Sequence, residues 1–224
     1  MASQNTFFWE VDTQRDFMLP DGKLYVRGAE KRIPNMRRLV DAARAGRVLL
    51  ISDACVHAPN DPEFQQFPPH CVAGTPGAEI LPELLADKNI RVTSDPHAKI
   101  PKNPFAYQQI ILEKQVLDVF INPHTEELIE RISPSGRSGH NAWFFVFGVV
   151  TEYCVRLAAK GLLERGRQVA VVTDAVETLD PAAGLKTIDE LDQLGARFVT
   201  ADEALAFLSG SLSRKQPGAT RSAP

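Results

Sequence analysis

Short apolar runs occur throughout the chain and alternate with longer segments whose apolar positions recur every three or four residues. Runs of β-branched and aromatic residues predict strands, whereas the helical period predicts amphipathic helices. The predicted strands are residues 7–11, 47–52, 90–93, 110–113, 142–150, 168–173 and 197–199. The predicted helices are residues 33–45, 78–86, 124–132, 182–194 and 201–208, with a further helix after residue 150. This alternation predicts one three-layer α/β/α domain over residues 1–208, with a mostly parallel central sheet.

The stretch FGVVTEYCVRLAAKGLLERG, residues 147–166, joins the end of a buried strand to a helix through a tight turn. Thr151 is the predicted N-cap, which places Cys154 in the first helical turn on the apolar face. The positive end of the helix macrodipole lowers the pKa of a thiol at that position, so Cys154 is a candidate nucleophile. On these residues alone, a buried structural cysteine is the commoner explanation.

The composition narrows the function classes. The net charge is -3 and the pI is near 6.0, so we expect no basic surface that would bind nucleic acid or an anionic membrane. Three irregularly spaced cysteines without a CxxC pair predict no disulfide framework and a reducing cytoplasm. We expect no targeting segment and no membrane span, because the start of the chain is not basic and no apolar run reaches 18 residues. The sequence contains neither a dinucleotide fingerprint nor a phosphate loop, so we expect no nucleotide cofactor. Residues 209–224 are predicted to form a disordered tail.

Three chemically capable residues follow three predicted strands. Asp12 follows the first strand, Lys114 follows the strand at 110–113, and Cys154 follows the strand at 142–150. Because ligand sites in such sheets form at the carboxyl ends of the strands, these side chains are expected to converge. A carboxylate can take the thiol proton and return it to a leaving amine, while an ammonium group holds both in place electrostatically. Each residue taken singly has an ordinary structural explanation, as a cap or a solvated strand end.

Four blocks give this set a family context. They are VDTQRDF (11–17), FPPHCVAGTPGAE (67–79), LEKQVLDVF (112–120) and GVVTEYCVRLAAKGLLERGRQVAVVTDAV (148–176). In content and order they resemble the signature blocks of the isochorismatase-like cysteine hydrolases, and particularly of nicotinamidases. The resemblance covers the chain from Phe7 to about Leu208 and implies the Rossmann-like fold of that family.

The resemblance implies roles for the converging residues. Asp12 would be the catalytic acid and base, Lys114 the third member of the triad, and Cys154 the nucleophile. A cis peptide between Val149 and Val150 would let the backbone N–H groups of Val150 and Cys154 form an oxyanion hole. Asp16, in the same block as Asp12, is expected to accept structural hydrogen bonds.

The resemblance also implies a divalent metal ion, most often zinc, beside the triad. His57, Glu63 and His70 match three of the family's ligand positions. Where the family has an aspartate two residues before the first histidine, this chain has Cys55, and Asp53 lies two residues further back. Either Asp53 or Cys55 is the fourth ligand, or the site is not filled. Sulfur, nitrogen and oxygen donors are all acceptable to zinc. In the alternative, these are polar loop residues without an ion.

Aromatic residues near these blocks indicate a small, flat substrate. Phe17 and Phe67 would sandwich it by resemblance, and Tyr153 precedes the nucleophile. Ordinary packing is the alternative explanation for these side chains, most of all for Tyr153.

The sequence as a whole predicts an enzyme that hydrolyses a small-molecule amide to a carboxylic acid and ammonia through a thioester, with nicotinamide as the first candidate. Another amide, a ureide or a carbamoyl compound is the alternative within the same superfamily, and cleavage of a vinyl ether is less favoured. A catalytically silent binding domain and a structural zinc module are the alternatives from other classes. The family resemblance further implies a homo-oligomer, and the cysteine pattern predicts a cytoplasmic location.

Overall fold

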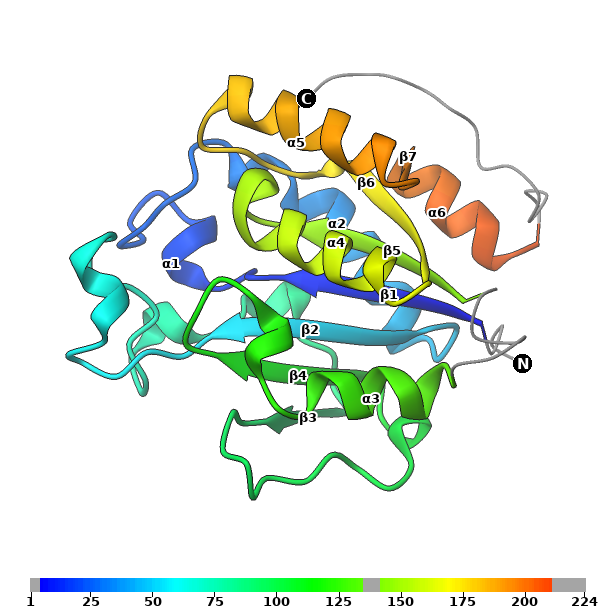
Figure 1. Cartoon of the computed structure of the whole chain (residues 1–224), viewed down its shortest axis with the longest axis horizontal. Helices are drawn as coiled ribbons and strands as arrows, with labels where there is room; N and C mark the ends of the chain where they lie inside the picture. Colours follow the sequence, from blue (N-terminus) through cyan, green and yellow to red (C-terminus); the bar gives the residue numbers. More distant parts are fainter. Residues whose placement is uncertain (1–4, 135–141, 211–224) are drawn as a thin grey trace.

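A computed structural model describes residues 5–134 and 142–210, which form one central sheet with helices on both faces (Figure 1). The seven strands lie in the order β3-β4-β2-β1-β5-β6-β7, and every neighbouring pair is parallel. The strands are β1 (Thr6–Val11), β2 (Leu49–Cys55), β3 (Asn89–Val92), β4 (Gln109–Lys114), β5 (Trp143–Gly148), β6 (Gln168–Val176) and β7 (Arg197–Val199). The first strand of the chain therefore lies in the middle of the sheet, between β2 and β5.

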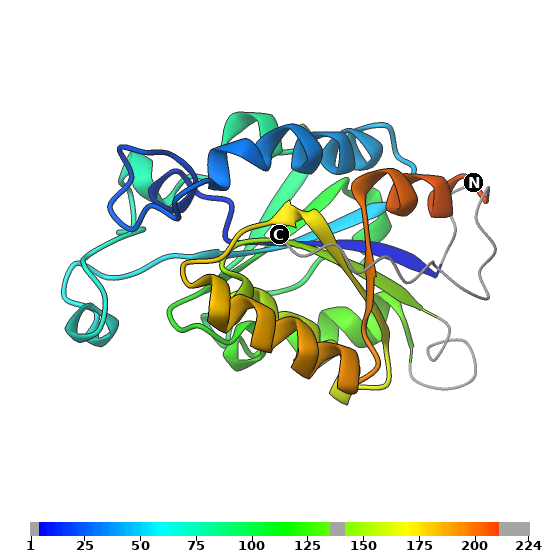
Figure 2. The ribbon, with the colours of Figure 1, turned by 90° about the horizontal axis from the view of Figure 1, so that it is seen from above.

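The helices form two layers around this sheet. Figure 2 shows α2 (Ile33–Arg44) and α6 (Ala201–Leu208) on one face. The opposite face carries α3 (Thr125–Ile132), α4 (Arg156–Glu164) and α5 (Pro181–Gln193). The short helix α1 (Arg15–Met18) lies near the carboxyl ends of the strands (Figure 1). This arrangement confirms the predicted three-layer α/β/α sandwich with a parallel sheet.

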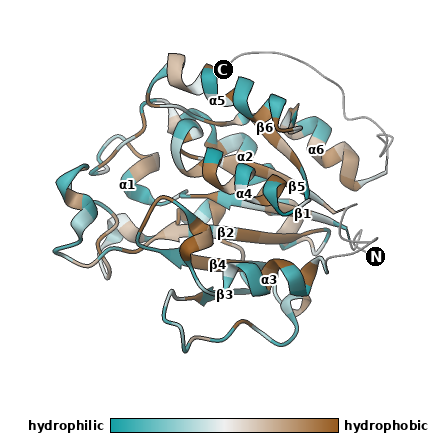
Figure 3. Ribbon diagram, viewed as in Figure 1, coloured by the Kyte–Doolittle hydropathy of each residue, from teal (hydrophilic) through white to brown (hydrophobic). Residues whose placement is uncertain are grey.

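Each face of the sheet has its own hydrophobic core. Along β1, Phe8 packs into the core shared with α2 and α6, whereas Phe7 and Trp9 pack into the core beneath α3, α4 and α5. This alternation is the two-residue period of a strand. Because both faces are covered, β1 and β5 are apolar along most of their length (Figure 3). Full burial of each such side chain contributes about 1.5–3 kcal/mol.

Two predicted elements differ from the observed ones. Residues 78–86 do not form the predicted helix; they contain the 3-10 turns Pro76–Ala78 and Pro82–Leu84. Pro82 explains this difference, since a proline inside a helix lacks the N–H donor and clashes with the preceding turn. The strand predicted at 47–52 instead occupies Leu49–Cys55, so Asp53 and Cys55 belong to the sheet and not to the loop that follows.

Of the tail predicted at residues 209–224, residues 211–224 lie outside the part of the chain that the structure describes. Within the ranges that the structure does describe, none of the helices has both the length and the apolar character needed to cross a membrane.

Candidate active site

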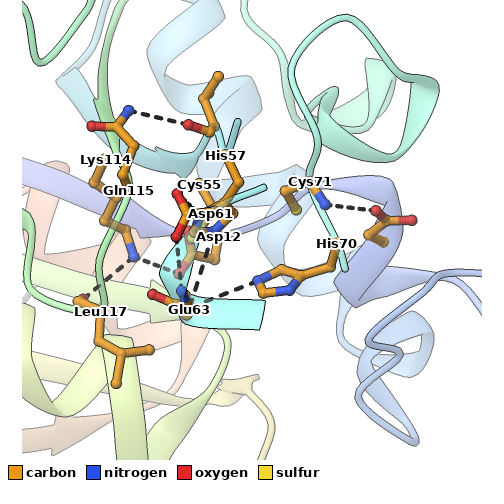
Figure 4. A network of polar contacts seen from close by, with 12 residues as sticks. Asp12, Cys55, His57, Asp61, Glu63, His70, Cys71, Lys114, Gln115 and Leu117 are labelled. Carbon is orange, nitrogen blue, oxygen red and sulfur yellow. Dashed lines mark hydrogen bonds and ion pairs between the residues drawn. The ribbon is translucent and has the colours of Figure 1, made fainter. Parts of the chain in front are cut away.

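Asp12 and Lys114 form a buried ion pair at the carboxyl ends of β1 and β4. Lys114 Nζ donates a hydrogen bond of 2.7 Å to Asp12 Oδ2, as Figure 4 shows. The backbone of Asp12 has a φ of 50°, a left-handed conformation that is unusual for a residue other than glycine. Its N–H donates to the carbonyl oxygen of Asp53. Strained backbone of this kind is concentrated at functional sites.

Electrostatics explain how the lysine stays charged there. Burial would lower the pKa of Lys114, but the negative charges around it, with Asp12 the foremost, raise that pKa well above its ordinary value. Burial raises the pKa of Asp53, while the Lys114 ammonium opposes that shift. The ammonium group is therefore a permanent positive charge beside Asp12.

Cys154 lies on a turn of π-helix, Thr151–Val155, that joins β5 to α4. The prediction that Thr151 is the N-cap is wrong: the cap position is Val150, and the Thr151 hydroxyl donates to the carbonyl of Glu177 at 2.8 Å. The predicted cis peptide between Val149 and Val150 is confirmed. A π-turn is a local feature that often occurs at functional sites.

Gly148 permits the sharp turn into this segment. It has a φ of 122°, and a Cβ at this position would lie 2.1 Å from the carbonyl oxygen of Val11. Only glycine allows β5 to end so close to β1. The contact brings the strand that precedes Cys154 against the strand that precedes Asp12.

The pKa of Cys154 departs from the prediction based on the helix macrodipole. Burial raises the pKa of this thiol well above its usual value, the Asp12 carboxylate raises it further, and only Lys114 opposes them. The thiol therefore keeps its proton until a base accepts it. Asp12 is the base in place, because a hydrogen bond with its carboxylate is one of the causes that raise the pKa of the thiol, and its Oδ1 is buried with no other hydrogen-bond partner among the described residues.

A narrow cavity opens beside the thiol. Its lining residues are Asp12, Phe17, Leu24, Cys55, Glu63, Phe67, His70, Leu117, Val149, Val150, Tyr153, Cys154 and Leu179. The three aromatic residues predicted to contact a substrate all line it. The rings of Phe67 and Tyr153 meet edge to face with centroids 6.0 Å apart, and Tyr153 is 37% exposed. The leucines were missed, because isolated apolar residues in loops carry no sequence signal.

Cys55, His57 and His70 form a buried group next to this cavity (Figure 4). Their ligating atoms all lie within 4.8 Å of one another. His57 is fully buried; its Nδ1 lies within hydrogen-bonding distance of the Asp61 carboxylate, and its Nε2 has no hydrogen-bond partner in the part of the chain that is described. His70 Nδ1 donates to the Pro68 carbonyl at 2.8 Å, so a neutral His70 has its lone pair on Nε2. Two unprotonated imidazole nitrogens and a sulfur suit zinc.

The other two predicted metal ligands, Glu63 and Asp53, differ in their position relative to the two histidines. Glu63 Oε1 lies 4.0 Å from His57 Nε2 and 3.9 Å from His70 Nε2, at the edge of the group. Asp53 is directed away from the histidines, toward Lys114 and Trp9. Of the two alternatives for the fourth ligand, the structure therefore places Cys55 beside the histidines. Asp61, which sequence analysis missed, has Oδ2 3.1 Å from His57 Nδ1.

Asp16 holds the loop that carries His70. Its Oδ2 accepts a hydrogen bond of 2.7 Å from the backbone N–H of Cys71, and its Oδ1 accepts one of 3.1 Å from the N–H of Lys23. These bonds confirm that Asp16 is a structural acceptor. They also fix the backbone next to His70 and so help to orient its ring toward the cavity.

The protein thus has an α/β/α fold with a parallel sheet, and a thiol, a carboxylate and an ammonium group lie at the carboxyl ends of its strands, a set of groups capable of hydrolytic chemistry. Residues 10–97 and 92–203 match the family model of the isochorismatase domain. The chain belongs to the isochorismatase family.

Individual relatives agree with this assignment at lower similarity. A protein described as a probable hydrolase, YcaC of Escherichia coli K12, is 33% identical over 75 residues, which cover 34% of each chain. The match thus spans about a third of that relative's length. The fold is similar to that of the pyrazinamidase of Pyrococcus horikoshii, solved in complex with zinc, with 24% identity, a TM-score of 0.67 and coverage of 88% and 99% of the two chains.

Two further solved structures share the fold. The nicotinamidase of Bacillus subtilis has 19% identity and a TM-score of 0.68, with 87% of this chain and 99% of that one covered. The N-carbamoylsarcosine amidase of Thermoplasma acidophilum has 20% identity and a TM-score of 0.65, with coverage of 88% and 97%. The structural neighbours thus include amidases named for different substrates.

Proposed function

We propose that this protein is a cysteine-dependent amidohydrolase that converts a small-molecule amide to a carboxylic acid and ammonia, with nicotinamide as the first candidate substrate. The observation that carries this proposal is the joint presence of Cys154 and Asp12 in one narrow cavity, with Lys114 bonded to Oδ2 of Asp12. The arrangement supplies a nucleophile, a base and a fixed positive charge.

The first half of the reaction forms a thioester. Asp12 Oδ1 takes the proton of the Cys154 thiol, and the sulfur attacks the carbonyl carbon of the amide. The backbone N–H groups of Val150 and Cys154 stabilise the oxyanion. As the tetrahedral intermediate collapses, the C–N bond breaks, and Asp12 returns the proton to nitrogen, which leaves as ammonia.

The second half releases the acid. A water molecule gives a proton to Asp12 and attacks the thioester carbonyl. The C–S bond then breaks, the acid leaves, and Cys154 regains its proton from Asp12. Asp12 therefore has to be a carboxylate at the start of each half of the reaction. Lys114 keeps that carboxylate oriented toward the thiol.

Cys55, His57 and His70 would hold the divalent ion, with Glu63 next to them, and zinc fits this donor set best. When bound, zinc supplies a Lewis acid that can hold a nitrogen or oxygen donor of the substrate. Phe17 and Phe67 would enclose a flat ring from the sides, with Tyr153 at the mouth of the cavity. A homo-oligomeric state and a cytoplasmic location stay predictions.

The decisive experiment measures ammonia release from nicotinamide and from a panel of small amides, with purified protein and its Cys154→Ala variant. Cys71→Ala is the matched control, because Cys71 is also buried but does not line the cavity. We expect turnover that disappears only in Cys154→Ala. No ammonia from any panel member, together with a Cys154 that resists alkylation, would favour a catalytically silent binding domain.

One observation favours a second candidate substrate class. Cys55 stands where the nicotinamidase pattern has an aspartate, so the group that would hold a pyridine nitrogen differs from that pattern. A ureide or carbamoyl compound has no ring nitrogen and does not require this interaction. Ammonia from a ureide, with none from nicotinamide, would retain the chemistry of Cys154 and move the substrate to this class.

A further inference from the structure

Asp53 is a buried acid that the proposed reaction does not use. Its side chain is only 1% exposed, and it does not line the cavity. Its Oδ1 lies 3.2 Å from Lys114 Nζ, and its Oδ2 accepts a hydrogen bond of 2.7 Å from the indole N–H of Trp9. Two carboxylates, those of Asp12 and Asp53, thus face a single ammonium group inside the protein.

Trp9 gives this carboxylate a fixed orientation. The indole is fully buried, stacks on Phe120 with centroids 6.3 Å apart, and also packs against Phe144. A ring held in this way fixes the direction of its N–H. Asp53 also reaches Asp12 through the backbone, since its carbonyl accepts the Asp12 N–H at 3.1 Å.

Burial raises the pKa of Asp53 to about 7, so above that pH the ionised cluster of Asp12, Asp53 and Lys114 carries one net negative charge in a buried place. Such a cluster is a poor source of stability, because the desolvation of charges offsets much of their attraction. An asparagine at position 53 would still accept the Trp9 bond and would remove the excess charge. The carboxylate therefore has an explanation in function rather than in folding.

We propose that Asp53 is a positioning residue, which serves as the second counter-ion of Lys114. This inference rests on the proposed function, in which Asp12 alternates between a carboxylate and a neutral acid. Each time Asp12 takes a proton, Lys114 loses its nearest anion, and Asp53 holds the ammonium in place. Asp53 also shares the Lys114 ammonium with Asp12. This sharing weakens the bond between Lys114 and Asp12, so the Asp12 carboxylate stays basic enough to accept a proton.

The test compares Asp53→Asn with wild-type protein at pH 8. We expect kcat to fall by about tenfold or more, because misplacement of a reacting group by about 1 Å costs on the order of a hundredfold. The KM should be unchanged, because Asp53 does not line the cavity. The midpoint of thermal unfolding should be equal or higher, because a buried charge is removed while the Trp9 bond is kept.

A second readout needs no substrate. The rate of Cys154 alkylation, located by mass spectrometry, reports how well Asp12 and Lys114 activate the thiol. The charge of Asp53 is one of the influences that raise the pKa of Cys154, so loss of that charge alone would favour the thiolate and speed alkylation. A positioning role gives the opposite sign, so we expect slower alkylation in Asp53→Asn.

Trp9→Phe tests the fixed orientation of Asp53, because it keeps the charge and removes the indole donor. We expect it to lower kcat less than Asp53→Asn does and to leave KM unchanged. Trp143→Phe is the matched control, since this second tryptophan packs against Phe145 and Phe207 on the other face of the sheet.

The outcomes separate the two proposals. If wild-type protein hydrolyses no amide, the proposed function fails, and the alkylation rate alone decides the role of Asp53. Alkylation in Asp53→Asn that is equal to or faster than in wild-type protein would overturn the positioning role. An unchanged kcat in Asp53→Asn, with normal turnover by wild-type protein, would overturn it as well.

Discussion

The ammonium of Lys114 lies 2.7 Å from the Asp12 carboxylate, and neither side chain is more than 2% exposed. These residues come from strands that are not neighbours, because β2 lies between β4 and β1. The buried ammonium has exchanged its water for protein partners, with Asp53 as a second carboxylate beside it, so the loss of Lys114 leaves buried charge without solvent. The consequences are measurable as changes in stability.

Lys114→Met is expected to lower the free energy of unfolding by about 3–5 kcal/mol, because two carboxylates remain buried without a cation. Urea unfolding measures this change. Lys160→Met is the control: Lys160 is 36% exposed and lies 3.8 Å from Glu164 at the surface of α4, so its loss should change stability by no more than about 0.5 kcal/mol. Equal stability of the two variants would contradict the importance of burial.

Glu10 makes the stability depend on pH. This residue of β1 is fully buried and accepts hydrogen bonds from Ser52, Thr13 and Gln109. Burial raises its pKa from 4.5 to about 7, although these hydrogen bonds act against the shift. The folded protein therefore keeps a proton that the unfolded chain has already lost. The contribution of protonated Glu10 to the free energy of unfolding is complete below pH 4.5 and is lost as the pH rises through 7. The whole contribution is roughly 3 kcal/mol.

Glu10→Gln should remove the share of this dependence that belongs to Glu10, because the amide has no proton to lose, whereas Asp53, whose pKa burial also raises to about 7, keeps its own share. Free energies of unfolding between pH 5 and 8 would then vary less in the variant than in wild-type protein. Glu126→Gln, whose side chain is 68% exposed, should retain the wild-type slope. A slope that is the same in all three proteins would place the titrating group elsewhere.

The metal group can be tested with cobalt, whose bond to a thiolate absorbs in the near ultraviolet. We expect this absorption in wild-type protein and in Cys71→Ala, and its absence in Cys55→Ala. Zinc affinity of Cys55→Ala should fall at least as much as the roughly 10- to 100-fold that loss of an outer-shell partner costs. Absorption that persists in Cys55→Ala would exclude Cys55 as a ligand. A chelated protein that keeps its fold would exclude a purely structural zinc module.

Gly148→Ala should be among the most damaging glycine substitutions. The added Cβ would meet the Val11 carbonyl at 2.1 Å in a backbone with φ of 122°. Left-handed strain of about 1–2 kcal/mol and overpacking of about 1–3 kcal/mol add at this position. Gly195→Ala is the control, because its φ is 95° but its Cβ meets nothing within 4 Å, so only the strain applies. Denaturant unfolding that gives equal losses for both variants would refute the role of the close contact.

The strands and the order of the layers could be predicted from local pattern, because strands buried on both faces leave continuous apolar runs such as residues 142–150. The convergence of Asp12, Lys114 and Cys154 followed from one rule about the ends of parallel strands. The predictions that failed concerned local hydrogen bonding. Thr151 has the right side chain for a cap, but the nearby Glu177 carbonyl accepts its hydroxyl, and the turn becomes a π-helix.

The sequence also failed to predict the role of Asp53, and the reason here is a different one. Its sequence neighbourhood, DACVH, offers two candidate donors before the histidine, and the choice depends on where β2 ends. The strand continues to Cys55, so Asp53 sits beside β1 and β4, where Trp9 and Lys114 already lie. Partners 44 and 61 positions away in the sequence decide its use, and no local pattern records them.

The position of β1 at the centre of the sheet has a consequence for synthesis of the chain. The strand that delivers Asp12 leaves the ribosome first, yet its two neighbours, β2 and β5, follow much later, and β5 is the last of the strands that bring the three site residues together. A partly made chain has an acid without a thiol and an apolar strand with open edges. Cys154 chemistry therefore requires a chain long enough to contain β1, β4 and β5, and a translation product truncated before Cys154 can show none.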